Sequence, residues 1–317
     1  MLKRIEWETR IGRQPSLRDL HVFICVAQSG SMGKAARQLR LSQPTVSEAI
    51  ADLEYLFGVK LFDRGARGVE ITPYGAAFLR RSVAVFDELL QTKRDIEFLA
   101  NSSTGELRIG ASESNAATFL PEVIREFFER YPGVTLHVDD VPPPASGSSV
   151  LRDRSCDLIL TRPRDHIVED DLNVEILFED EMMVAAGPNS RWIRRRKIAL
   201  AELIDEPWIL TGPSTWNHAR ITEAFLAQGL AMPKIALVTG SVHLRTHLLA
   251  NSSFIAAFPR SVLRSDGDRF LLKPLPVDLP HRPWPVAIVT LKNRTLSPVV
   301  ARFIECAREV AKSFASA

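Results

Sequence analysis

The sequence predicts an all-α, winged-helix N-terminal domain followed by a long linker helix and a two-lobed α/β region. Residues 16–75 carry apolar positions at helical spacing and end in a glycine-rich hairpin. From residue 105 onward, apolar strands alternate with amphipathic helices, a pattern typical of α/β proteins. A chain of 317 residues also exceeds one ordinary core, so we expect two or three globular units.

The composition indicates a soluble, well-packed protein, because 45% of the residues are apolar and 25% are charged. No apolar stretch approaches the roughly 20 residues of a membrane helix, so we expect no membrane partner. The N-terminal extension, residues 1–15, is charged and lacks an apolar core, which predicts a cytoplasmic protein without a signal peptide. Cys25, Cys156 and Cys306 lie far apart in apolar segments, which favours buried, reduced thiols.

Net charge alone identifies no partner. The whole chain carries +2, and Ser31–Thr72 holds six basic against five acidic residues. This is a weak electrostatic footprint for a nucleic-acid-binding unit. An argument for DNA binding therefore has to rest on the positions of particular side chains.

Three helices are predicted at the start of the N-terminal domain. Ser16 caps the first, over Leu17–Gln28, and Ser31 caps a short second helix. Ser42 caps the third, with Pro44 in its first turn, where a missing N–H costs nothing. The second and third helices, from about Met32 to Leu53, form a helix-turn-helix.

A wing follows the third helix. Leu61–Ile71 reads as a hairpin whose tip carries Arg64 and Arg67, which suit phosphate or minor-groove contact. Gln43, Thr45 and Ser47 can reach base edges in the major groove of double-stranded DNA. The alternative is a small helical bundle with an arginine-tipped loop. The predicted DNA-contacting residues are Ser31, Lys34, Ser42, Gln43, Thr45, Ser47, Glu48, Arg64 and Arg67.

A linker helix is predicted from Pro73 to about Ala100, with Thr72 as its cap. Its apolar positions follow spacings of four, three and four residues, which is a coiled-coil stripe. We expect self-association through it, although such a stripe can also belong to a domain core. A dimer would read a pseudo-palindromic operator. The stripe residues are Leu79, Val83, Phe86 and Leu90. Asn101–Gly105 is polar and is expected to be a hinge.

The alternation after residue 105 predicts two lobes built on mostly parallel sheets. The first lobe is expected to take residues 105–165 and 275–317, and the second 166–274, including a strand at Val174–Phe178. The last strand and the C-terminal helix thus return to complete the first lobe.

Ligands of open α/β sheets bind beyond the carboxyl ends of the strands, in the cleft between lobes. Polar residues follow several predicted strands at such positions. Arg162 could clamp a carboxylate in bidentate fashion, which favours an anionic effector, whereas Glu113 indicates a hydroxyl or amine as well. Taken singly, each residue is more simply a cap or a turn. The predicted effector-binding residues are Ser112, Glu113, Ser114, Thr161, Arg162, Thr211, Ser241 and Phe258.

Ordered motifs run through both halves of the chain. The first half contains Ser31–Ala36, Leu41–Ser47, Ile50–Glu54, Leu56–Arg64 and Thr72–Gly75. The second contains Gly105–Gly110, Asp157–Leu160, Glu206–Leu210, Phe258–Leu263 and Lys292–Pro298.

In this order the motifs resemble the LysR-type transcriptional regulators. The resemblance implies a periplasmic-binding-protein-like effector domain, a homodimer or homotetramer, and a small-molecule effector. One departure is Glu48, where many members carry Lys or Arg. A carboxylate there cannot bind phosphate, so this chain is expected to recognise an operator of its own.

Motifs of common enzymes are absent, including G-x-S-x-G, G-x-x-x-x-G-K and H-E-x-x-H, so we expect no catalytic residue and no cofactor. His243 and His247 lie four apart without a third candidate ligand, which argues against a metal. A basic cluster, Arg191–Lys197, is interpreted as solvated surface or a subunit contact. The alternatives to a regulator are an enzyme and a small-molecule receptor without a DNA role.

Overall fold

The computed structural model describes residues 15–65, 68–100, 104–141, 144–163, 169–264, 271–279 and 283–315. The chain divides into two compact units, Met1–Thr92 and Lys93–Ala317. Most of the N-terminal extension and of the expected hinge lies outside the described residues.

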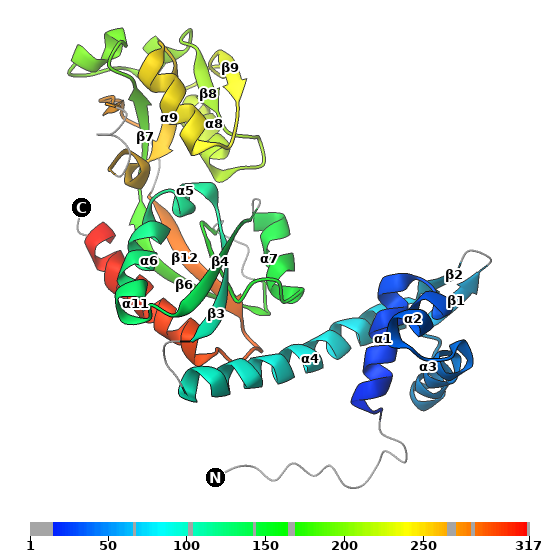
Figure 1. Ribbon diagram of the computed structural model, residues 1–317. Coiled ribbons are helices and arrows are strands. Elements are labelled where there is room, and N and C mark those ends of the chain that lie inside the picture. Colours follow the sequence, from blue (N-terminus) through cyan, green and yellow to red (C-terminus); the bar gives the residue numbers. More distant parts are fainter. Residues whose placement is uncertain are drawn as a thin grey trace. The chain divides into compact units, whose positions relative to one another are not determined.

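The first unit contains the predicted trio of helices, α1 (Leu17–Ser29), α2 (Met32–Leu39) and α3 (Gln43–Phe57) (Figure 1). Each is capped by the predicted serine, whose hydroxyl accepts from a backbone N–H of the first turn. The helices share one core in which Phe23, Ala35 and Val46 are fully buried. The zero exposure of Ala35 is consistent with the close helix approach that a small side chain permits.

The wing consists of β1 (Phe62–Gly65) and β2 (Gly68–Ile71), paired antiparallel. Val69 donates its N–H to Gly30 O at 3.0 Å, so the hairpin is tied to the turn after α1. Gly68 lies at φ +133°, and a Cβ there would stand 2.4 Å from Gly30 O. Only glycine fits this contact without movement of the backbone.

Helix α4 (Pro73–Ala100) begins in the first unit, and its last turns belong to the second. Only some of the apolar residues predicted to mediate self-association are exposed on this helix. Leu79 packs against the core of the first unit, and the Phe86 ring lies 5.9 Å from that of His21. Val83 is half-buried, and Leu90 is 56% exposed. Further exposed apolar residues on this helix are Val85, Leu89, Ile96 and Leu99.

The second unit contains two five-stranded sheets. The first has the order β4-β3-β5-β12-β6, where the strands are β3 (Gly105–Ala111), β4 (Val134–Asp140), β5 (Leu158–Thr161), β6 (Leu172–Asp180) and β12 (Trp284–Leu291). Leu158 and Leu160 face the core formed with α6 (Phe119–Arg130) and α11 (Pro298–Ala315). Ile159 faces the opposite side, which α7 (Pro144–Arg152) covers.

The second sheet has the order β11-β7-β10-β8-β9, where the strands are β7 (Met182–Ala186), β8 (Trp208–Leu210), β9 (Ile235–Val238), β10 (Ile255–Pro259) and β11 (Lys273–Pro274). Helix α8 (Trp216–Ala227) packs on one face of it and α9 (Val242–Asn251) on the other. Two short 3-10 helices, η1 (Arg191–Arg194) and η2 (Leu200–Leu203), also belong to this lobe.

One lobe boundary was predicted wrongly. The strand expected at Val174–Phe178 in the second lobe is β6, and it pairs antiparallel with β12 in the first sheet. The chain crosses between lobes at Glu181, between β6 and β7. The sheets are also mixed rather than mostly parallel, because β12 and β7 run antiparallel to their neighbours. Strand β12 lies in the first sheet, and α11 packs in the core of the same lobe.

Several shorter elements were not predicted, namely α5 (Glu113–Ala116), α7, the two 3-10 helices, β11 and a helical turn over 260–264. All three cysteines are buried, as expected, and burial raises the pKa of the Cys156 thiol to about 11. Among the described helices, none combines the length and the apolar character that a membrane-spanning segment requires.

Candidate functional site

The N-terminal turn of α3 exposes most of the side chains predicted to contact DNA. Ser42, Gln43, Thr45 and Glu48 are exposed, and Ser47 is half-buried. The Ser42 hydroxyl accepts from Thr45 N at 3.2 Å and lies 2.8 Å from the Thr45 hydroxyl. Because Pro44 has no N–H and the Thr45 N–H is used in this cap, Gln43 is the residue of the first turn that could offer its backbone N–H to a phosphate.

The start of α2 lies beside this turn. Ser31 accepts from Lys34 N at 3.4 Å, and the Lys34 side chain is exposed. The Gln43 side chain lies against Gly33, because a Cβ on that glycine would stand 3.4 Å from Gln43 Oε1. Candidate residues from two helices therefore form one polar surface. Arg64 lies in β1, and Arg67 lies outside the described residues.

Glu54 supports the wing and was not predicted to do so. Its carboxylate is buried, accepts from Leu61 N at 3.0 Å and Phe62 N at 3.3 Å, and pairs with Lys60 Nζ at 2.5 Å. Burial raises the pKa of Glu54, but these three hydrogen bonds outweigh it and leave the pKa below its ordinary value. An acidic residue on the inner face of a recognition helix could have signalled this role.

A cavity of about 180 Å³ lies between the two lobes of the second unit. Six of the eight predicted effector-binding residues line it, namely Ser112, Glu113, Ser114, Thr161, Arg162 and Thr211. The other two do not. Ser241 caps α9 beside the lining residue Gly240, and Phe258 is fully buried beneath the Arg245 guanidinium, 4.6 Å from its ring.

Arg162 is the central cation of this cavity. It is 1% exposed, its Nη2 donates to Asp180 Oδ2 at 2.7 Å, and its guanidinium lies 4.9 Å from the Trp216 ring. Burial lowers the pKa of Arg162, and the Asp180 charge opposes that shift. The expected bidentate clamp needs revision, because Asp180 already occupies Nη2. Nε and Nη1 are buried and find no hydrogen-bond partner among the described residues.

A second buried cation, Arg245, lines the cavity and was not predicted. Its Nη1 donates to Ala257 O at 3.0 Å, and Asn217 Nδ2 donates to the same carbonyl at 3.0 Å. Burial lowers the pKa of Arg245 to about 10, and the charge of Glu113 partly offsets this. Both side chains come from helices, α9 and α8, whereas the prediction considered only residues that follow strands.

One hydrogen bond crosses the cavity directly. Glu113, on α5 of the first lobe, accepts from Val242 N at the start of α9 in the second lobe, at 2.5 Å. A carboxylate suits a helix N-terminus, where the helix dipole is positive. This bond links the two lobes beside the cavity, which Glu113 also lines.

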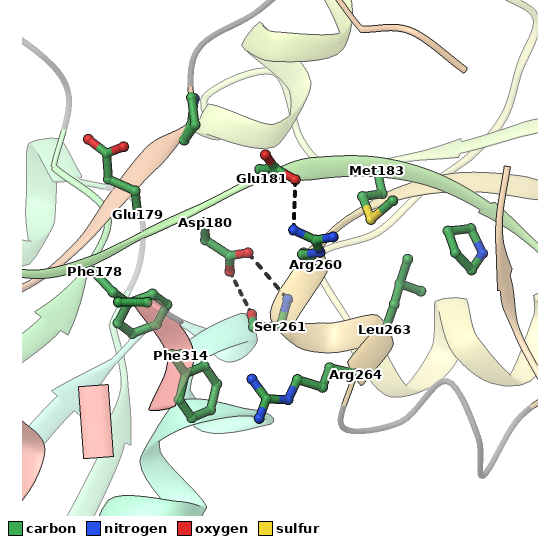
Figure 2. Close-up of a pocket in the computed structure, with 13 residues that line it drawn as sticks. Phe178, Glu179, Asp180, Glu181, Met183, Arg260, Ser261, Leu263, Arg264 and Phe314 are labelled. Atoms are coloured by element: carbon green, nitrogen blue, oxygen red, sulfur yellow. Dashed lines mark hydrogen bonds and ion pairs between the residues drawn. The ribbon is translucent and has the colours of Figure 1, made fainter. Parts of the chain in front are cut away.

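A larger hollow of about 430 Å³ lies where β6 runs into β7 (Figure 2). Asp180 forms part of its wall and accepts from Ser261 N at 3.2 Å and Ser261 Oγ at 2.7 Å. Glu181 pairs with Arg260 at 3.1 Å on its rim. Because Asp180 also pairs with Arg162, one carboxylate joins this hollow to the cavity between the lobes.

An aromatic stack extends from Arg162 to the strand that returns to the first lobe. The Trp216 and Trp284 rings lie 5.8 Å apart, and the Arg220 guanidinium lies 4.1 Å from Trp284. Trp284 is also paired with Asp180 across β12 and β6. Arg162 therefore contacts Asp180, at the end of β6, and Trp216, whose ring lies against Trp284 at the start of β12.

Comparison with protein families identifies both halves of the chain. Residues 17–76 match the bacterial regulatory helix-turn-helix protein family of the lysR type, and residues 100–312 match the LysR substrate binding domain. The chain belongs to the LysR family. It is therefore a DNA-binding transcription regulator with an effector-binding domain, and not an enzyme.

Individual relatives of this regulator are also similar over most of its length. The HTH-type transcriptional regulator TdcA of Escherichia coli strain K12 is 28% identical over 296 residues, which cover 93% of each chain. The structure of a full-length OxyR variant from Pseudomonas aeruginosa has a TM-score of 0.63 at 21% identity and covers 95% of both chains. Full-length CbnR in complex with its target DNA has a TM-score of 0.51 at 22% identity over 93% of this chain and 99% of that one. These two structures support the fold.

Metal binding finds no support among the described residues of the regulator, where no three His, Cys, Asp or Glu side chains gather in a way that could hold an ion. The His243 and His247 rings are stacked 6.4 Å apart on α9. Of the basic cluster, Arg191 and Arg195 form ion pairs with Glu206 and Glu202.

Proposed function

We propose that this regulator responds to a small organic carboxylate bound in the 180 Å³ cavity between its lobes. The observation that carries the proposal is Arg162, a buried guanidinium of which two nitrogen atoms lack hydrogen-bond partners within the described part of the chain. A buried donor without a partner costs about 1–3 kcal/mol. The acceptor oxygens of a carboxylate would remove that cost.

The effector would act on an equilibrium between lobe arrangements. A ligand shifts such an equilibrium only by binding one arrangement more tightly than the other. The bond from Val242 N to Glu113 and the pair of Arg162 with Asp180 are the contacts that an incoming carboxylate would compete with. Its binding would thereby alter how the lobes are held.

For DNA, we propose that α3 enters the major groove with Gln43, Thr45 and Ser47 toward the bases. Ser31, Lys34, Ser42 and the wing arginines Arg64 and Arg67 would hold the backbone. The exposure of Gln43 and Thr45 supports this division, and Glu48 would accept from cytosine or face solvent.

The oligomer is proposed as a homodimer that assembles into a homotetramer. The exposed apolar residues of α4 support self-association through this helix. A two-fold assembly would place two recognition helices on a pseudo-palindromic operator. The CbnR complex with target DNA supports a DNA role for this architecture. We assign residues 16–75 to DNA binding, 76–104 to the linker and 105–317 to effector binding.

The carboxylate proposal is tested by thermal denaturation with a panel of aliphatic and aromatic carboxylates. A ligand that binds the folded state raises the Tm. Arg162→Lys keeps one positive charge but removes guanidinium donors, so it should reduce that increase. Arg294→Lys is the matched control, because Arg294 is also a buried arginine, paired with Asp157 at 2.9 Å, and does not line the cavity.

Two results would overturn the proposal. One is a panel in which no carboxylate raises the Tm of the unchanged protein. The other is an equal carboxylate-induced increase in Arg162→Lys and Arg294→Lys.

A further inference from the structure

We infer that the effector is a hydroxy acid, a small non-aromatic carboxylate that carries a hydroxyl group near its carboxyl end. The inference rests on the proposed function, because it assumes that a carboxylate occupies the cavity between the lobes. It adds the requirement for a hydrogen-bond donor on the ligand and names the residue that would recognise that donor, Asn217.

The orientation of the Asn217 amide is determined by its neighbours. Nδ2 lies 3.0 Å from Ala257 O, which can only accept, so the nitrogen must face that carbonyl. Oδ1 therefore points the other way, where it is buried and no described residue donates to it. Asn217 lines the cavity. A buried amide oxygen in this position requires a donor, and a ligand hydroxyl supplies one.

The complementary groups lie on the first lobe. Arg162 Nε and Nη1 and the Ser112 hydroxyl are buried without partners among the residues that the structure describes, and both residues line the same cavity. These donors require acceptor oxygens. A ligand that satisfies both lobes therefore has its carboxylate toward Arg162 and a hydroxyl toward Asn217. A plain carboxylate would leave Asn217 Oδ1 unpaired.

The lining of the cavity argues against an aromatic acid. Its volume of about 180 Å³ lies below the roughly 300–1,000 Å³ of pockets for drug-sized ligands, which favours a small effector. Of the described lining residues, only Val141, Trp216 and Pro259 have apolar side chains. A short, polar acid fits this environment better than one with a large apolar body.

A hydroxyl suits Asn217 better than an ammonium group does. Arg245 Nη1 and Asn217 Nδ2 donate to the same carbonyl, so a buried guanidinium lies next to the Asn217 amide. This positive charge would repel an ammonium group, and a neutral amide oxygen would not compensate its desolvation.

The test is isothermal titration calorimetry of the full chain with acids that differ in one group. The matched set is succinate, both enantiomers of malate, and aspartate, with propionate and lactate as a shorter pair. One malate enantiomer should bind roughly 5- to 100-fold more tightly than succinate, because the hydroxyl removes one buried unpaired acceptor. Malate should also bind more tightly than aspartate.

Asn217→Ala should bring malate and succinate to similar affinity, while Asn251→Ala should leave their ratio unchanged. Asn251 is the matched control, because it is an exposed asparagine whose Nδ2 also donates to a backbone carbonyl, that of His247. If Asn217→Ala does not fold, the ratio of malate to succinate affinity in the unchanged protein still decides the question.

Equal affinity for the hydroxylated and plain acids, or preference for aspartate, would overturn the inference and leave the carboxylate proposal standing. Failure of every acid in this set to bind would overturn the inference, and failure of the whole panel of aliphatic and aromatic carboxylates to raise the Tm would overturn the carboxylate proposal as well.

Discussion

Replacement of Asp180 with asparagine tests whether this carboxylate is the counter-ion that stabilises the buried Arg162 in the cavity between the lobes. The Asp180 carboxylate is 6% exposed and accepts from Arg162 Nη2 at 2.7 Å and from Ser261 N and Oγ. Asp180→Asn removes the counter-ion of a buried guanidinium and replaces an acceptor oxygen with a donor. Loss of one partner of a buried pair costs about 3–5 kcal/mol.

For an effector domain of this size, each kcal/mol lowers the Tm by about 2–4 °C, so Asp180→Asn should lower it by roughly 6–20 °C. A bound carboxylate would replace the lost counter-ion of Arg162. The variant should therefore bind carboxylates more tightly than the unchanged protein, and saturating carboxylate should restore much of the lost Tm.

The assay is differential scanning calorimetry with and without the carboxylate that stabilises the unchanged protein most. Glu181→Gln is the matched control, because Glu181 is the next residue and forms an exposed ion pair with Arg260, worth about 0–1 kcal/mol. Equal destabilisation by the two substitutions would refute the reasoning. So would equal recovery of the two variants by carboxylate.

Three further predictions concern the N-terminal half. Gln43→Ala should reduce discrimination between operator and random DNA, whereas Arg64→Ala should weaken both alike, and fluorescence anisotropy on the two DNAs distinguishes these effects. Glu54→Ala should destabilise the DNA-binding unit by about 1–3 kcal/mol in urea denaturation, because it leaves the buried N–H groups at the start of the wing unpaired. The pKa of Glu54 is lowered in the folded state, so ionised Glu54 should stabilise the folded unit fully above the ordinary glutamate pKa of about 4.3. This contribution should disappear as the pH falls through the lower folded pKa. The pH profile of Glu54→Ala should lack this dependence. Leu90→Asp should weaken self-association more than Val83→Asp, as measured by sedimentation velocity, because Leu90 is the more exposed of the two. The opposite order would contradict the proposal that the chain self-associates through the exposed apolar residues of α4.

Local signals were sufficient for the first unit. Ser16, Ser31 and Ser42 each cap a helix at the predicted position, because capping depends on residues within one turn. The polar surface of α3 followed from the same local spacing. The role of Glu54 was missed, since its partners lie six to eight residues away on a loop whose path depends on the whole domain.

The site between the lobes was only partly predictable. The rule about strand ends found Ser112, Thr161 and Arg162, because it concerns residues at or directly after the end of a strand. It could not find Arg245 and Asn217, which reach the cavity from helices and are positioned by the distant carbonyl of Ala257. Likewise, Asp180 pairs with Arg162 only because β6 belongs to the first sheet, and apolar periodicity does not determine sheet membership.

The stack of Trp216 on Trp284 has a practical consequence for solution work. The indole of Trp216 lies between a ligand-facing cation and a second indole on the returning strand, so its excited state is sensitive to any change in the spacing of the two lobes. The other tryptophans of the described chain, Trp192 and Trp208, are buried in the core of the second lobe and contact neither this ring pair nor Arg162. The proposed change in lobe arrangement on effector binding should therefore alter the intrinsic tryptophan fluorescence, and stopped-flow fluorescence would measure its rate without an attached dye.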